Sequence, residues 1–153
     1  MSIRSVRGRA VAAVLMAAGL VAPSVAQAPP SPFKAHVDLK TFMEHVLTPA
    51  AKVIWRANGL VIDANGEHDL APRTDADWEL LVTGSATLAE ATNALLIPER
   101  VRDPAWTGHV QRLAAAAAKA YRGAEAHDLK AVSEVSDQLD GLCAACHRQY
   151  GLE

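Results

Sequence analysis

Cysteine is scarce in this chain of 153 residues, which contains only Cys143 and Cys146. A structural zinc site usually takes four ligands from two C-x-x-C pairs, and two thiols are too few to supply them. The apolar run at residues 10–22 is too short to cross a bilayer, and no other run is long enough, so we expect no membrane span. No stretch alternates apolar and polar residues as a half-buried strand does. An all-α fold is therefore predicted.

The first 26 residues have the pattern of a cleaved signal peptide. Small residues follow the apolar run, and three arginines precede it: Arg4, Arg7 and Arg9. Cleavage after Ala26 suits the small-residue rule, because Ser24 occupies the third position back; cleavage after Ala28 suits it less, because Pro29 follows. An uncleaved amphipathic anchor is the alternative. Export through such a signal predicts a periplasmic protein.

Removal of the signal leaves an acidic domain. Taking 26 of the 153 residues away leaves 127, which is enough for one domain with one core. Three of the 15 Lys and Arg leave and none of the 17 Asp and Glu, so the formal net charge falls from -2 to -5. No basic stripe remains, which excludes nucleic acid binding. An acidic surface would suit basic or neutral protein partners.

Apolar residues recur at helical spacing in four stretches, after a flexible, Pro-rich lead-in at residues 27–36. Pro49 should bend the first helix, because its nitrogen cannot donate to the carbonyl of His45. Residues 58–73 carry turn signals and form a long connection that would cover one end of a pocket. Short links elsewhere imply an antiparallel four-helix bundle. Within a domain at residues 37–153, we predict helices at residues 37–57, 74–97, 104–124 and from 128 through the Cys pair.

Helix starts have recognisable capping residues in this sequence. Thr74 or Asp75 would cap the second helix, Asp103-Pro104 would open the third, and Asp128 would begin the fourth. The apolar stripes predict which side chains face the core. They include Met43 and Leu47 in the first helix, Leu88 and Leu96 in the second, Val110 and Tyr121 in the third, and Leu129, Val132, Cys143 and Cys146 in the fourth.

The last predicted helix carries Cys143-Ala144-Ala145-Cys146-His147, which is the haem-attachment pattern C-x-x-C-H. Each thiolate would add to one vinyl group of haem to form a thioether, and His147 would become the proximal iron ligand. In a helix these three residues sit at i, i+3 and i+4 and therefore share one face. The pattern predicts one covalent haem c in the bundle.

Two other uses of the Cys pair are alternatives. A thioredoxin-like redox pair also reads C-x-x-C, but it is expected beside a βαβ pattern, and this sequence has none. A structural disulfide between positions i and i+3 would close a loop too small to stabilise the fold much. Haem attachment explains the adjacent imidazole, which the alternatives do not.

A haem motif on the last helix of an exported four-helix chain resembles the class II c-type cytochromes, the family of cytochrome c prime and its low-spin monohaem relatives. Residues 43–51 (MEHVLTPAA), Ile54-Trp55, residues 87–93 (TLAEATN) and Tyr150 add to the likeness. The resemblance implies that the first helix forms the distal face of the haem. It also implies that an apolar residue there leaves the iron five-coordinate, whereas a Met makes it six-coordinate.

Met43 is the candidate distal ligand, because Met1 and Met16 leave with the signal. Ligation by Met43 would raise the reduction potential and favour simple electron transfer. Alternatively, Met43 packs as an adaptable core residue while Leu47, one turn along, faces the iron. His45 is a weaker candidate, since residues two apart on a helix cannot face the same way.

The remaining candidates around the haem are weaker. Four histidines are expected to be solvated rather than to bind iron: His36, His68, His109 and His127. Three tryptophans could line the haem: Trp55, Trp78 and Trp106. Lys40 and Arg56 are candidates for meeting the haem propionates.

These observations predict a periplasmic monohaem cytochrome, monomeric or homodimeric, that carries single electrons between other periplasmic redox proteins and is not an enzyme. The main alternative is a five-coordinate haem protein of the cytochrome c prime type that binds nitric oxide. A haem-based sensory module fits less well, since no second domain follows the motif.

Overall fold

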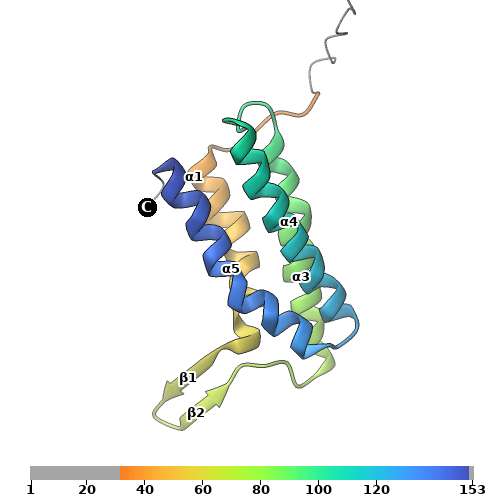
Figure 1. Cartoon of the computed structure of the whole chain (residues 1–153). Coiled ribbons are helices and arrows are strands. Elements are labelled where there is room, and N and C mark those ends of the chain that lie inside the picture. The colour runs from red at the N-terminus through yellow and green to blue at the C-terminus, as the bar shows by residue number, and fades with distance from the viewer. Residues whose placement is uncertain (1–31, 152–153) are drawn as a thin grey trace, which may run out of the picture. The chain divides into compact units, whose positions relative to one another are not determined.

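The computed structural model describes residues 32–151, and these are mostly helical, in agreement with the predicted helical class (Figure 1). The predicted signal peptide and the first part of the lead-in lie outside the described residues. No helix between residues 32 and 151 is long and apolar enough to cross a membrane. In chain order the elements are α1 (Leu39–Phe42), the π-helix η1 (Met43–Leu47), α2 (Thr48–Trp55), the 3-10 helix η2 (Arg56–Asn58), β1 (Leu60–Asp63), β2 (Gly66–Asp69), α3 (Asp75–Ala91), the 3-10 helix η3 (Thr92–Leu96), α4 (Pro104–Glu125) and α5 (Leu129–Tyr150).

The first predicted helix is present as one helical run, but it changes type along its length. Asp38 caps its start by accepting hydrogen bonds from the N–H of Thr41 at 2.9 Å and from its hydroxyl at 2.7 Å. The turn just before Pro49 is a π-helix, in which the N–H of Thr48 donates to the carbonyl of Met43. We attribute this wider turn to Pro49, because its ring crowds the preceding carbonyls and it has no N–H to donate. The predicted bend is therefore taken up by η1.

Residues 58–73 contain a β-hairpin, so the prediction that the chain has no strands was wrong here. β1 and β2 pair antiparallel, with Leu60 opposite Asp69 and Asp63 opposite Gly66. Gly66 follows the turn at a φ of 118°, where other residues are strained. The Asn65-Gly66 turn signal was visible in the sequence. Because β2 contains no apolar residue and all strand residues are exposed, no alternation of hydrophobicity marked the strands.

The predicted starts of the later helices are confirmed. Thr74 and Asp77 form a reciprocal capping box at α3: the Asp77 N–H donates to the Thr74 hydroxyl at 3.2 Å, and the Thr74 N–H donates to the Asp77 carboxylate at 2.9 Å. Asp103 accepts from the N–H of Trp106 at 2.8 Å at the start of α4, and Asp128 accepts from Ala131 at 3.1 Å at the start of α5.

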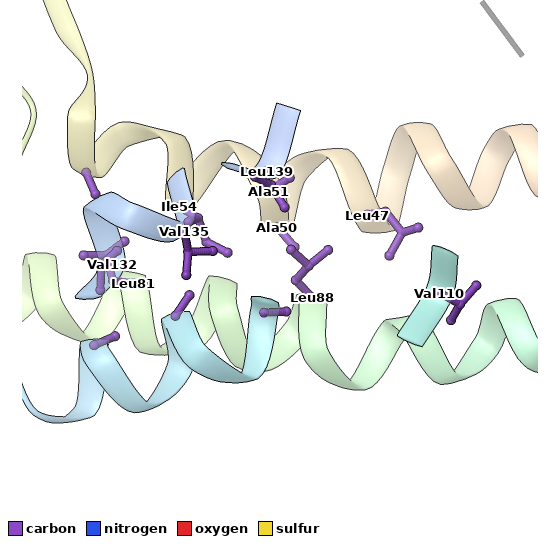
Figure 2. Packing of buried hydrophobic residues seen from close by; sticks show 14 of the residues in the cluster. Leu47, Ala50, Ala51, Ile54, Leu81, Leu88, Val110, Val132, Val135 and Leu139 are labelled. Atoms are coloured by element: carbon purple, nitrogen blue, oxygen red, sulfur yellow. The ribbon is translucent and has the colours of Figure 1, made fainter. Parts of the chain in front are cut away.

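The long helices share one hydrophobic core. Consecutive long helices run in opposite directions (Figure 1), and the packed pairs are α2 with α3, α3 with α4, α4 with α5, and α2 with α5. Figure 2 shows Ile54 and Ala51 of α2 pointing toward Val135 and Leu139 of α5, with Leu88 of α3 nearby. Fully buried side chains from all four of these helices hold the elements together by excluding water from apolar surface.

Three predicted core positions are wrong: Leu96, Tyr121 and Leu129 are exposed by 36%, 36% and 37%. Leu96 is the last residue of the 3-10 helix η3, in which only Leu95 of the two predicted leucines is buried. Small residues bring α5 against α4, and a Cβ on Gly123 would lie 3.1 Å from both Ala131 and Val132. Tyr121 is two residues away from Gly123 on the helix, so its side chain does not face that contact.

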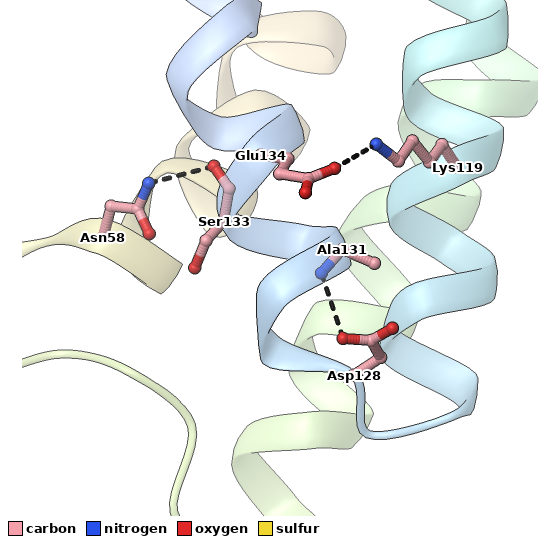
Figure 3. A network of polar contacts seen from close by, with 6 residues as sticks. All are labelled: Asn58, Lys119, Asp128, Ala131, Ser133 and Glu134. Atoms are coloured by element: carbon pink, nitrogen blue, oxygen red, sulfur yellow. Dashed lines mark hydrogen bonds and ion pairs between the residues drawn. The ribbon is translucent and has the colours of Figure 1, made fainter.

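Polar contacts fasten α5 to its neighbours (Figure 3). The Asn58 side-chain amide donates to the carbonyl of Ser133 at 3.0 Å and to the Asp137 carboxylate at 2.7 Å, which ties η2 to α5. The Lys119 ammonium lies 2.6 Å from the Glu134 carboxylate and links α4 to α5. Exposed pairs contribute about 0 to 1 kcal/mol, so they fix orientation more than they stabilise.

Candidate functional site

A cavity lies between the first helical run, α4 and α5, near the C-terminal end of α5. Its volume is about 120 Å³, and the surrounding empty space, including the part open to solvent, is about 750 Å³. Its lining is mostly apolar, which is typical of cofactor pockets. The lining residues are Met43, Leu47, Thr48, Ala51, Trp55, Leu88, Leu95, Trp106, His109, Val110, Leu113, Leu142, Cys143, Cys146 and His147. None comes from residues 58–73, which border a different, smaller hollow through Leu70 and Pro72.

All three residues of the C-x-x-C-H motif line this cavity from α5. The motif lies in the last two turns of the helix, which ends at Gly151 with a φ of 63°. Cys143, Cys146 and His147 are half-buried, and both thiols are free. The helix therefore presents two sulfurs and one imidazole to one apolar space.

Burial raises the pKa of the Cys143 thiol, and the nearby Asp140 carboxylate raises it further. Burial also raises the pKa of Cys146, although the charges of Arg102 and Arg112 oppose it. Reactive cysteines of redox pairs have lowered pKa values, because the thiolate is the nucleophile. The raised pKa values favour the neutral thiol at both positions.

The opposite wall comes from the first helical run. Met43 in η1 is half-buried and lines the cavity, and so does the buried Leu47. The wider turn of η1 brings both side chains, and that of Thr48, to the cavity. His45 between them is exposed and does not line it. Both distal candidates, the thioether and the isobutyl group, are thus present on this wall.

The α4 wall was predicted from the sequence except for His109. Trp106 is fully buried, and its indole N–H donates to the carbonyl of Leu95 at 2.8 Å. His109, Val110 and Leu113 continue this wall. Their spacing with Trp106 is that of one helical face, which was the available signal. The expectation that His109 is solvated was wrong, because it is half-buried and lines the cavity.

The two ring nitrogens of His109 are both engaged. Nδ1 lies 3.0 Å from the Arg112 guanidinium, and Nε2 lies 2.8 Å from the side-chain oxygen of Gln149. A guanidinium can only donate, so Nδ1 accepts and Nε2 carries the proton that it donates to Gln149. In this arrangement neither nitrogen is free to bind a metal.

Tyr150, Asp103 and Trp106 are in contact at one end of the site, and we call this group the clasp. The Tyr150 hydroxyl donates to the Asp103 carboxylate at 2.7 Å, and its ring meets Trp106 edge-on at 5.2 Å between ring centres. Partial burial of the phenol, together with the hydrogen bond to Asp103, raises the pKa of Tyr150 to about 12. The clasp joins the end of the motif-bearing helix to the start of α4.

Other predicted site residues lie elsewhere. Trp55 and Trp106 line the cavity, whereas Trp78 stacks on His127 with 4.7 Å between ring centres. The two propionate candidates do not line it: Lys40 is exposed and lies 3.7 Å from Glu44, and Arg56 borders a different hollow beside Leu70 and Asp77. The remaining histidines of the described chain, His36 and His68, are exposed.

The donor set matches what a covalent haem requires. Two thiols and an imidazole on one helix face, a thioether across the cavity and an apolar lining between them are the groups that hold haem c. Within residues 32–151, the cavity included, no three His, Cys, Asp or Glu side chains lie close enough together to hold a bare metal ion.

No protein-family model, no curated protein and no solved structure matches the chain.

Proposed function

We propose that this chain is a monohaem c-type cytochrome of the class II kind, a four-helix bundle that carries single electrons between exported redox proteins. One observation carries the proposal: Cys143, Cys146, His147 and Met43, from opposite ends of the described chain, line the same apolar cavity. The two thiols would bind the vinyl carbons of haem, and His147 would bind its iron. The haem supplies reversible one-electron chemistry when bound.

The other lining residues would tune the site. Leu88, Leu95, Trp106 and Val110 exclude water from the cavity, and a low-dielectric shell favours the less charged, reduced state. α5 holds both thiols and the imidazole on one rigid element, fastened to α4 through the contact between Lys119 and Glu134. Rigid support of this kind suits a carrier that must not rearrange between oxidised and reduced states.

The test is the spectrum of protein exported through a cytochrome c maturation system. We expect covalent haem that survives denaturation and is absent from the Cys143→Ala/Cys146→Ala variant. The ferric protein should show the low-spin sulfur-to-iron charge-transfer band, and Met43→Leu should abolish it. The matched control is Leu113→Met, which places a thioether elsewhere on the wall and should leave the band unchanged. A colourless wild-type protein with both thiols free would end the proposal.

A second function is favoured by Leu47, which is only 5% exposed and lines the same wall as Met43. If Leu47 faces the iron, one coordination position stays open and the protein would bind nitric oxide. The wild type would then be high-spin and would bind the gas as readily as Met43→Leu does. Under the carrier proposal, only Met43→Leu should gain rapid nitric oxide binding.

A further inference from the structure

Two arginines stand at the edge of the cavity beside Cys146. The guanidinium carbon of Arg102 lies 5.5 Å from the ring centres of both Trp106 and Tyr150. The guanidinium of Arg112 lies 3.0 Å from Nδ1 of His109. Because Trp106 and His109 line the cavity, rings of the cavity wall position both cations.

Both side chains are exposed and retain unused hydrogen-bond donors. The ion pairs found within residues 32–151 involve Lys40, His68, Arg73 and Lys119, and neither Arg102 nor Arg112 takes part in one. Asp103 adjoins Arg102 in sequence, but its carboxylate already accepts from Trp106 and Tyr150. A guanidinium offers five N–H groups in a fork that fits a carboxylate.

Two positive charges stand at this edge of the cavity, although the whole molecule is acidic. The complete chain has a formal net charge of -2, which favours basic or neutral partners. At the cavity edge, however, the guanidinium groups of Arg102 and Arg112 lie against the rings of Trp106, Tyr150 and His109. A docking partner responds mainly to charges within about 10 Å at moderate salt, so the local patch outweighs the distant net charge.

We propose that Arg102 and Arg112 form a docking surface for an acidic redox protein, which would present carboxylates to the two guanidinium groups beside Cys146. This inference rests on the proposed function, because it places the partner against the motif-bearing helix. Salt-dependent attraction of this kind raises association rates and sets the orientation of the complex.

The test uses two small oxidants of opposite charge on the reduced holoprotein: ferricyanide and the tris(phenanthroline) complex of cobalt(III). In each reaction one electron passes from the protein to the metal complex and lowers the oxidation state of its metal by one. No bond is formed or broken, and no proton is transferred. We expect the ferricyanide rate to fall as ionic strength rises from about 0.05 to 0.5 M, and the cobalt rate to rise. In the Arg102→Gln/Arg112→Gln variant the ferricyanide rate should drop by about 3- to 10-fold at the lower salt.

Two matched variants separate local from net charge. Arg73→Gln/Arg122→Gln removes the same charge away from the cavity and should change the ferricyanide rate far less. Arg102→Lys/Arg112→Lys keeps the charge and should retain most of the rate. An NMR measurement gives a readout that is independent of electron transfer. The paramagnetic anion hexacyanochromate should broaden the amide NMR signals around Arg102 and Arg112 in the wild type and not in the double Gln variant.

Equal loss of rate in the remote double variant, or a ferricyanide rate that rises with salt in the wild type, would overturn the docking surface while leaving the haem assignment intact. A colourless protein would overturn the proposed function and this surface together. Sedimentation of the wild type, but not of the double Gln variant, with phosphatidylglycerol vesicles would assign the arginines to a membrane surface instead and overturn the redox partner.

Discussion

Two glycines at helical positions should respond in opposite ways to the same substitution. A Cβ on Gly84 of α3 would lie 2.6 Å from Cβ and 2.7 Å from Cγ1 of Val53 in α2, whereas a Cβ on Gly141 of α5 meets nothing within 4 Å. Real Cβ atoms do not approach so closely, so Gly84→Ala must push α2 and α3 apart. Overpacking of this kind costs about 1 to 3 kcal/mol.

Each substitution also gains helix propensity, because Ala is favoured over Gly by about 1 kcal/mol in a helix interior. The Val53 contact is with a branched carbon next to the backbone and cannot rotate away, so we take the upper end of the overpacking range. Gly84→Ala should therefore lower the free energy of unfolding by about 1 to 2 kcal/mol. Gly141→Ala should raise it by about 0.5 to 1 kcal/mol.

Urea unfolding followed by circular dichroism measures both changes. With a slope of about 2 kcal/mol per molar urea, the midpoint should fall by about 0.5 to 1 M in Gly84→Ala and rise by a few tenths in Gly141→Ala. The haem content of each variant must be the same, since bound haem adds stability to the folded state. An unchanged or higher midpoint in Gly84→Ala would refute the close packing of α2 on α3.

Two further measurements probe the end of the molecule that carries the motif. Trp106→Phe removes the indole donor and leaves the carbonyl of Leu95 without its partner, so the free energy of unfolding should fall by about 1 to 3 kcal/mol. Trp55→Phe, which changes a half-buried ring, should lower it less. Equal losses of stability in the two variants would contradict this. Hydrogen bonds from the start of α4 and from Tyr150 hold the pKa of Asp103 below its ordinary value, so the unfolded chain binds more protons in acid. This stability is present above about pH 4 and is lost as the pH falls through the lowered pKa. Tyr150→Phe should weaken that acid dependence in a pH titration of unfolding, and an unaltered pH profile would refute the clasp.

The wide turn at η1 links fold and function. Pro49 would break an ordinary helix at this position, and the π-helix before it absorbs the missing hydrogen bond. The same turn carries Met43 and Leu47. The proposed electron transfer requires Met43 at the iron, whereas nitric oxide binding requires Leu47 there. A substitution such as Pro49→Ala would let the run return to regular helix and would rotate Met43 relative to Leu47.

Local sequence alone determined much of the secondary structure. Helix starts at Thr74, Asp103 and Asp128 were predictable, because a capping side chain bonds only to N–H groups two or three residues away. The placement of Cys143, Cys146 and His147 on one face followed from helical spacing alone. The helical class, the helix caps and the motif all depend on residues that are close together in the chain, so a single sequence is enough to predict them.

Tertiary structure decided the rest, because it depends on contacts between distant residues. Tyr121 and Leu129 follow the helical period, yet both are exposed, because the buried face of α4 runs through Ala117, Ala120 and Ala124 and that of α5 begins at Val132. β2 forms by backbone hydrogen bonds that need no apolar side chain, so hydrophobicity could not reveal it. The cavity joins Met43 and His109 to a motif far along the chain, and only packing of the helices brings these side chains to one space.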